Sequence, residues 1–136
     1  MLKRILSVVI AVAISMTFVM GFEYIGGHIF QRPQGDMKDP KAISDMMASM
    51  PITAFLWILL GYAISSFVGG LIATLISGRY KATPALIVGA VLMGGGIMNI
   101  IMIPYHPFWF MICDILVFLP FAWLGYFLVR AKGKTQ

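Results

Sequence analysis

The chain has 136 residues, of which 60% are hydrophobic and only 11% are charged, and its mean hydropathy is +0.93. Soluble domains are about half apolar and about one-quarter charged, and a chain this short cannot bury so much apolar surface in one aqueous core. The composition therefore excludes a water-soluble monomer, a disordered segment and, with one cysteine, a disulfide scaffold. Because the basic residues behind the net charge of +5 flank long apolar runs, they indicate membrane topology rather than nucleic-acid binding.

Four apolar runs follow one another along the chain, at about residues 5–28, 52–77, 84–103 and 107–129. A helix needs about 20 residues to cross a hydrocarbon core of about 30 Å, and every run is long enough. None shows the alternation over about ten residues that marks a transmembrane β-strand. The sequence predicts an all-α polytopic membrane protein, with residues 1–136 forming a single transmembrane domain built as a four-helix bundle.

The first run follows Lys3 and Arg4, so a cleaved signal peptide is the alternative to a retained helix. Its charge-free stretch, residues 5–22, is longer than the usual signal core of about 7–15 residues. No small-x-small cleavage site precedes a polar mature start. We therefore expect this run to be retained as the first span.

The first loop, residues 31–51, is the only sizeable polar segment. Asp39 and Pro40 provide an N-cap and a proline at the first helical position. Apolar side chains then recur at helical spacing, at Ile43, Met46, Met47 and Met50. We predict a short interfacial helix from Pro40 to Met50 that lies on the outer membrane surface with its apolar face down. A lid whose flexible methionines dock a partner is the alternative.

The distribution of basic residues predicts the direction of the spans. Seven fall at the N-terminus, in the second loop and in the C-terminal tail, at Lys3, Arg4, Arg79, Lys81, Arg130, Lys132 and Lys134. The first loop holds three, Arg32, Lys38 and Lys41, among acidic residues, and the third loop holds none. The positive-inside rule therefore places both termini in the cytoplasm.

Small residues predict how the helices pack, because helices in lipid associate through close backbone approach. The second run carries two adjacent rows of small residues at four-residue spacing, Gly61, Ser65, Gly69, Ala73 and Ser77 beside Ser66, Gly70, Thr74 and Gly78. The first run has a partial match at Ser7, Ala11 and Ser15. The third run contributes Gly89 and the consecutive Gly94, Gly95 and Gly96, which fit either tight helix crossing or a hinge that exposes backbone carbonyls.

Polar side chains gather in one half of the predicted bundle. Ionisable residues within spans are costly and are functional candidates by default, and here they are Glu23 and Asp114. Helix direction places both on the outer side, together with His28, Asn99 and His106. We therefore predict a polar cluster in the outer leaflet that consists of these five residues.

Three chemistries fit this cluster. Its histidines and carboxylates are metal-ligand types, but no pair has a recognised metal-site spacing, so we assign no metal site and no cofactor. The carboxylates and imidazoles could instead relay protons or bind a cation. The third interpretation is packing, with Asp114 accepting hydrogen bonds from Asn99, a serine or a tyrosine, or carrying a proton. No catalytic motif is visible, so we predict no enzymatic activity and no catalytic residues.

Four segments carry a resemblance to a known family: residues 22–28, Asp39-Pro40, Met50-Pro51 and residues 54–74. Through these segments the chain resembles a family of small four-span bacterial inner-membrane proteins that has no characterised activity. The resemblance covers most of the chain and implies a bacterial inner-membrane setting, but it implies no mechanism.

The leading functional hypothesis is a non-enzymatic accessory or assembly subunit of a larger membrane-protein complex, or a self-associating homo-oligomer, because spare faces of small residues suggest partners. The alternative is a small oligomeric transporter or ion conduit that uses Asp114, with Asn99, inside the membrane and Glu23 or His28 at its outer mouth. A third possibility is lipid or quinone binding among the aromatic residues of the fourth run.

Overall fold

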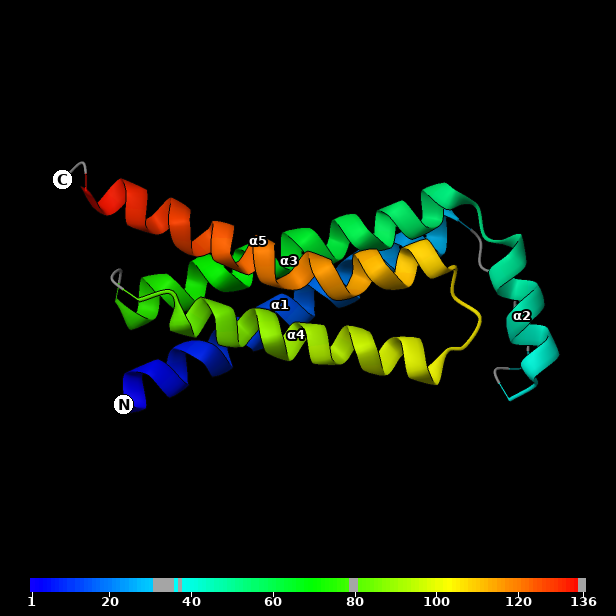
Figure 1. The fold of residues 1–136 in the computed structure, drawn as a ribbon, viewed down its shortest axis with the longest axis horizontal. Helices are drawn as coiled ribbons and strands as arrows, with labels where there is room; N and C mark the ends of the chain where they lie inside the picture. Colours follow the sequence, from blue (N-terminus) through cyan, green and yellow to red (C-terminus); the bar gives the residue numbers. More distant parts are fainter. Residues whose placement is uncertain (31–35, 37, 79–80, 135–136) are drawn as a thin grey trace.

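The computed structural model describes residues 1–30, 36, 38–78 and 81–134. The described residues form five helices, α1 (Leu2–Ile29), α2 (Pro40–Ser49), α3 (Ile52–Ser77), α4 (Thr83–Met102) and α5 (Phe108–Lys134). The four long helices run alongside one another, and α2 lies across one end of them (Figure 1). The predicted all-helical fold, with four long helices and a short helix in the first loop, is confirmed.

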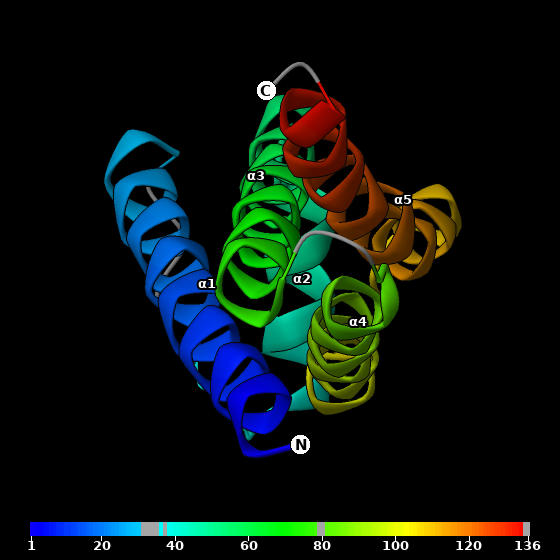
Figure 2. The ribbon, with the colours of Figure 1, turned by 90° about the vertical axis from the view of Figure 1, so that its left-hand side faces the viewer.

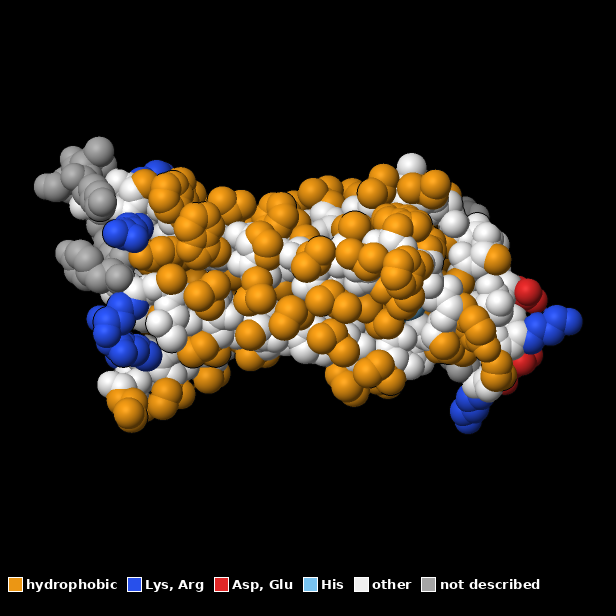
Figure 3. Space-filling view, in the orientation of Figure 1, with side chains coloured by type: hydrophobic (Ala, Val, Ile, Leu, Met, Phe, Trp, Pro, Cys, Tyr) orange, Lys and Arg blue, Asp and Glu red, His pale blue; other side chains and the backbone are white. Residues whose placement is uncertain are grey.

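Each long helix is long and apolar enough to cross a membrane. Large apolar side chains are exposed on all four, including Val9, Leu60, Val91 and Leu116. Figure 3 shows a broad hydrophobic band between two charged ends. These features are those of a multi-pass membrane protein, whose outer surface contacts lipid rather than water.

Both chain termini lie at the same end of the bundle, which we call the termini end, and α2 marks the opposite end, the α2 end (Figure 1). Lys and Arg side chains gather at the termini end, whereas acidic and basic side chains mix at the α2 end (Figure 3). Of the basic residues used to predict direction, Arg32 and Arg79 and the side chain of Lys134 lie outside the described residues.

Helix α3 occupies the centre of the bundle and contacts α1, α4 and α5 (Figure 2). On its α1 side, Ser15 donates a hydrogen bond of 3.0 Å to the carbonyl of Ser65. Ser7, Ala11 and Ser15 are all fully buried, and a Cβ atom on Gly69 would collide with Ser15. The small residues of the first and second runs therefore pack against each other within one chain.

On the other side of α3, its backbone approaches the backbone of α5 directly. A Cβ atom on Gly70 would collide with the backbone of Ala122, and one on Gly125 would collide with the backbone of Phe67. The Ser66 hydroxyl donates a hydrogen bond to the carbonyl of Phe118. The second row of small residues is thus also occupied inside the chain, and it brings α3 and α5 into backbone contact.

Helix α4 continues without a break through its three consecutive glycines. Only Gly96 packs tightly, against Asp114 and Phe118. A Cβ atom on Gly94 or Gly95 would meet nothing within 4 Å among the described residues. These two glycines therefore lie on an open face of α4 rather than in a helix crossing within the chain.

The short helix α2 begins as predicted, because the Asp39 side chain caps it by accepting a hydrogen bond of 3.0 Å from the backbone N–H of Lys41. The apolar face of α2 packs against the helix bundle, whereas the sequence predicts that it lies on the membrane surface. Ile43 and Met47 are buried in one cluster with Phe55 of α3 and Phe110 of α5. The apolar face of α2 therefore covers the end of the bundle and does not depend on lipid for its burial.

Candidate functional site

The polar residues inside the bundle meet at Tyr62, ten residues into α3. The Tyr62 side chain is only 5% exposed. Its hydroxyl accepts a hydrogen bond of 3.0 Å from the Asn99 amide of α4 and donates one of 3.4 Å to Oε1 of Glu23 on α1. One phenol therefore joins three helices through a continuous chain of polar contacts.

Asp114 of α5 lies beside this chain and is only 1% exposed. Its carboxyl group contacts the bare backbone of Gly96, next to the ring of Phe118. Neither of its oxygens forms a hydrogen bond with any described residue. The Asn99 amide, one of the donors that the packing interpretation offers to Asp114, donates to Tyr62 instead.

Phe118 connects the two parts of the site. Its ring centroid lies 5.3 Å from that of Tyr62, and its edge reaches Gly96 together with the carboxyl group of Asp114. Asn99 lies one helical turn beyond Gly96. Asp114 and Glu23 both lie close enough to the Tyr62 hydroxyl for their negative charges to act on it. We call Glu23, Tyr62, Asn99 and Asp114 the intramembrane polar cluster.

The two histidines of the predicted cluster lie elsewhere. His28 is exposed, and its Nδ1 donates to the carbonyl of Tyr24 on its own helix, at 2.9 Å. His106 lies in the connection between α4 and α5, where its ring stacks on Phe110 with centroids 5.3 Å apart. Burial lowers the pKa of His106 below its ordinary value, and a contact with the backbone of Ile103 offsets part of that effect.

The intramembrane polar cluster is made of oxygen-rich groups: two carboxyls, a phenol and an amide. Within the described part of the chain, no three His, Cys, Asp or Glu side chains come together as a set that could hold a metal ion. A carboxylate enclosed without a hydrogen-bond donor is costly unless it binds a proton or a cation. The chemistry that this arrangement supports is therefore uptake and release of a proton or a small cation.

The sequence analysis missed Tyr62, the residue at the centre of the site. One signal could have found it, because a hydroxyl in the middle of an apolar span must obtain a hydrogen-bond partner from a neighbouring helix. Aromatic residues in membrane proteins are enriched at the interfaces, so a tyrosine in mid-span is an exception that needs a polar partner.

Comparison of this chain with protein-family models, with curated proteins and with solved structures finds no match. The resemblance to a bacterial inner-membrane family thus stays a prediction.

Proposed function

We propose that this protein is a non-enzymatic, multi-pass protein of the bacterial inner membrane that binds and passes a proton or a small cation through the intramembrane polar cluster. Both termini would lie in the cytoplasm, and the α2 end would face outward. The observation that carries the proposal is the carboxyl group of Asp114, which is fully enclosed and lacks a hydrogen-bond partner among the described residues.

A packing role explains Asp114 poorly. An ionised aspartate within a membrane span is costly, and no hydrogen bond from a described residue offsets that cost. An apolar side chain of similar size would fill the space beside Gly96 and Phe118 without this penalty. Reversible binding of a proton or a cation would give the carboxyl group a function that explains why it is buried despite this cost.

The other members of the cluster lie beside Asp114 and are joined to one another by hydrogen bonds. Tyr62 both accepts and donates hydrogen bonds, as a proton relay requires. Glu23 is half-buried and lies six residues before the end of α1, and Asn99 lies three residues before the end of α4.

Flux across liposomes tests this proposal. Protein reconstituted into sealed vesicles should carry protons, Na⁺ or K⁺ down an imposed gradient, measured with pH- and cation-sensitive dyes. Asp114→Asn should abolish this flux, whereas Asp45→Asn, which changes an exposed carboxylate of α2, should leave it intact. The proposal fails if the parent protein carries none of these ions, or if folded Asp114→Asn protein carries them at the parent rate.

A second candidate is an accessory or assembly subunit, and one observation favours it. Gly94 and Gly95 lie on an open face of α4, with the exposed Val91 and Met98 one turn to either side of Gly95. A helix of another subunit could approach this face closely. Gly95→Leu should then reduce the mass of the complex seen by native mass spectrometry, whereas Gly21→Leu, on an open face of α1, should not. An unchanged mass would reject this role.

A further inference from the structure

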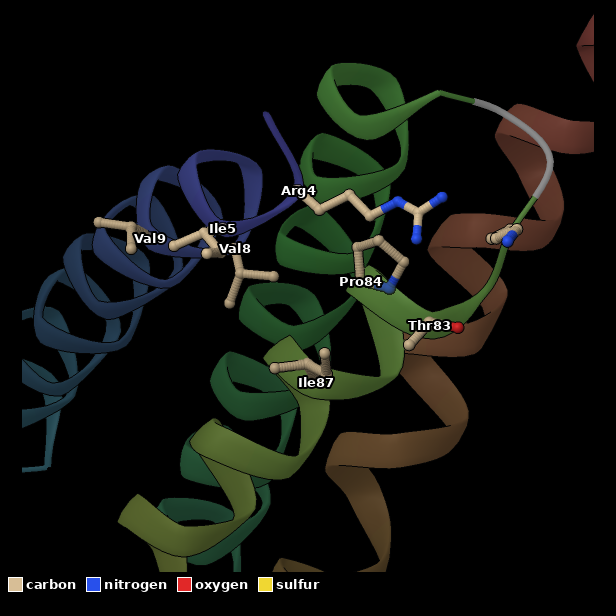
Figure 4. Close-up of a pocket in the computed structure, with 8 residues that line it drawn as sticks. Arg4, Ile5, Val8, Val9, Thr83, Pro84 and Ile87 are labelled. Carbon is tan, nitrogen blue, oxygen red and sulfur yellow. The ribbon is translucent and has the colours of Figure 1, made fainter. Parts of the chain in front are cut away.

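A groove of about 230 Å³ lies between α1 and α4 at the termini end, away from the intramembrane polar cluster (Figure 4). Its walls are apolar and include Ile5 and Val8 of α1 and Ile87 of α4. Its rim carries two cationic side chains, Arg4 and Lys81. The groove therefore combines an apolar slot with a positive entrance.

No acidic side chain neutralises this entrance. The chain has five acidic residues, which all belong to the intramembrane polar cluster or to the first loop and α2: Glu23, Asp36, Asp39, Asp45 and Asp114. The first turns of α1 and α4 contain none. Arg4 and Lys81 thus present a positive charge to whatever enters the groove.

The start of α4 adds a second attraction for an anion. Helix α4 begins at Thr83, beside the groove, and no side chain caps its first turn. The first N–H groups of a helix lack intrahelical partners and carry the positive end of the helix dipole. A phosphate at the rim would therefore meet two cations and the N–H group of Thr83, since the next residue, Pro84, has no N–H and Ala85 is buried.

We propose that this groove binds one anionic phospholipid, with its phosphate between Arg4 and Lys81 and one acyl chain along Ile5, Val8 and Ile87. The position fits a lipid, because the rim lies where the basic end of the molecule meets its hydrophobic band (Figure 3). A second copy of the chain is a poor occupant. In the same membrane orientation it would bring its own basic residues against Arg4 and Lys81, and these like charges would repel.

Native mass spectrometry of delipidated protein tests the headgroup contact. Titration with phosphatidylglycerol and phosphatidylcholine of identical acyl chains should show one retained molecule with a preference for phosphatidylglycerol. Arg4→Gln should lower phosphatidylglycerol binding about fivefold, the effect of one basic residue near an anionic lipid surface. Lys3→Gln removes the same charge from an exposed neighbour outside the groove and should retain the preference. Equal binding of both lipids by the parent, or an equal loss in both variants, would overturn the proposal.

A second pair of variants tests the acyl-chain contact. Ile87→Trp should fill the groove and reduce the retention of both lipids. Val91→Trp is the control, because Val91 lies one turn further along α4, outside the groove, with 48% exposure against 45% for Ile87. The proposal is overturned if inorganic phosphate displaces the bound anion while Ile87→Trp has no effect, which would indicate a free phosphate site, or if the groove is occupied by a second copy of the chain.

Discussion

Oδ2 of Asp114 lies 2.8 Å from the position that a Cβ atom would occupy on Gly96, so the carboxyl group rests on bare helix backbone. The ring of Phe118 comes within 2.7 Å of the same position. Gly96 therefore provides the space that lets α5 bring an aspartate into the bundle against α4. The glycine and the carboxyl group form one structural unit.

Gly96→Ala should destabilise the protein, because the added methyl group forces both Asp114 and Phe118 to move. Overpacking of this kind costs about 1–3 kcal/mol, and thermal unfolding in detergent micelles would measure it. Gly95→Ala is the matched control, because its methyl group would meet nothing within 4 Å among the described residues and alanine favours helix by about 1 kcal/mol. Equal destabilisation by the two variants would contradict the contact between Gly96 and Asp114.

Gly70→Ala should be more damaging than Gly96→Ala. Its methyl group would collide with the backbone of Ala122, and a backbone cannot rotate away as a side chain can. We expect α3 and α5 to separate, with a loss at or above the upper end of the range of about 1–3 kcal/mol. Unfolding of Gly70→Ala and Gly94→Ala in the same detergent would test this expectation. A stability of Gly70→Ala as high as that of Gly94→Ala would show that the two helices are not in backbone contact.

The spans could be predicted because the length of an apolar run is visible directly in the amino-acid sequence. The fourth span is the least accurate, since helix α5 continues to Lys134 beyond the predicted end at residue 129. The extension is polar but remains helical, and the Arg130 guanidinium donates to the hydroxyl of Tyr126 one turn earlier, at 3.2 Å. Apolar length marks where a helix can cross the membrane, but it does not mark where the helix ends.

For the candidate site, the sequence predicts only how far along each helix the polar residues lie, and not which way their side chains face. Helix direction predicts that Glu23, Asn99 and Asp114 share one half of the bundle, but the rotation of each helix depends on packing. That rotation turns Tyr62 inward and leaves His28 outside. Small residues have the same limitation, since their spacing predicts a close contact but does not identify the partner. Gly61 and Gly69 on α3 pack against α1 of the same chain and Gly70 packs against α5, whereas Gly78 at the end of the second row is exposed.

Trp57 is held inside the bundle by a specific hydrogen bond. Its Nε1 donates to the carbonyl of Phe22 on α1, at 2.8 Å, and its indole covers Gly26. Trp57→Phe keeps an aromatic ring but removes the donor, so the free energy of unfolding should fall by about 1 kcal/mol. Trp123→Phe, which changes an exposed indole of α5, is the control. If both variants unfold at the same temperature, the bond does not contribute to stability.

Tyr62→Phe should weaken the intramembrane polar cluster. Without the hydroxyl, the Asn99 amide loses its acceptor and Glu23 loses its donor, and a buried polar group left unpaired costs about 1–3 kcal/mol. Part of this loss should be recovered in Tyr62→Phe/Asn99→Leu, where no unpaired amide remains. Unfolding of the two single variants and the double variant completes the cycle. Strict additivity of the two losses would show that Tyr62 and Asn99 do not interact.

His106 makes stability depend on pH. Burial lowers its pKa in the folded protein below the ordinary value of 6.5, so the unfolded chain takes up a proton at a higher pH than the folded protein does. Protonation therefore favours unfolding. The contribution of neutral His106 to stability is fully present above about pH 6.5 and is lost as the pH falls below that value. His106→Gln should reduce the fall in melting temperature between pH 7.5 and pH 5. His28→Gln retains His106 and should therefore retain its contribution to the acid-induced loss. A His106→Gln variant that loses as much stability as the parent on acidification would show that the buried imidazole does not cause this dependence.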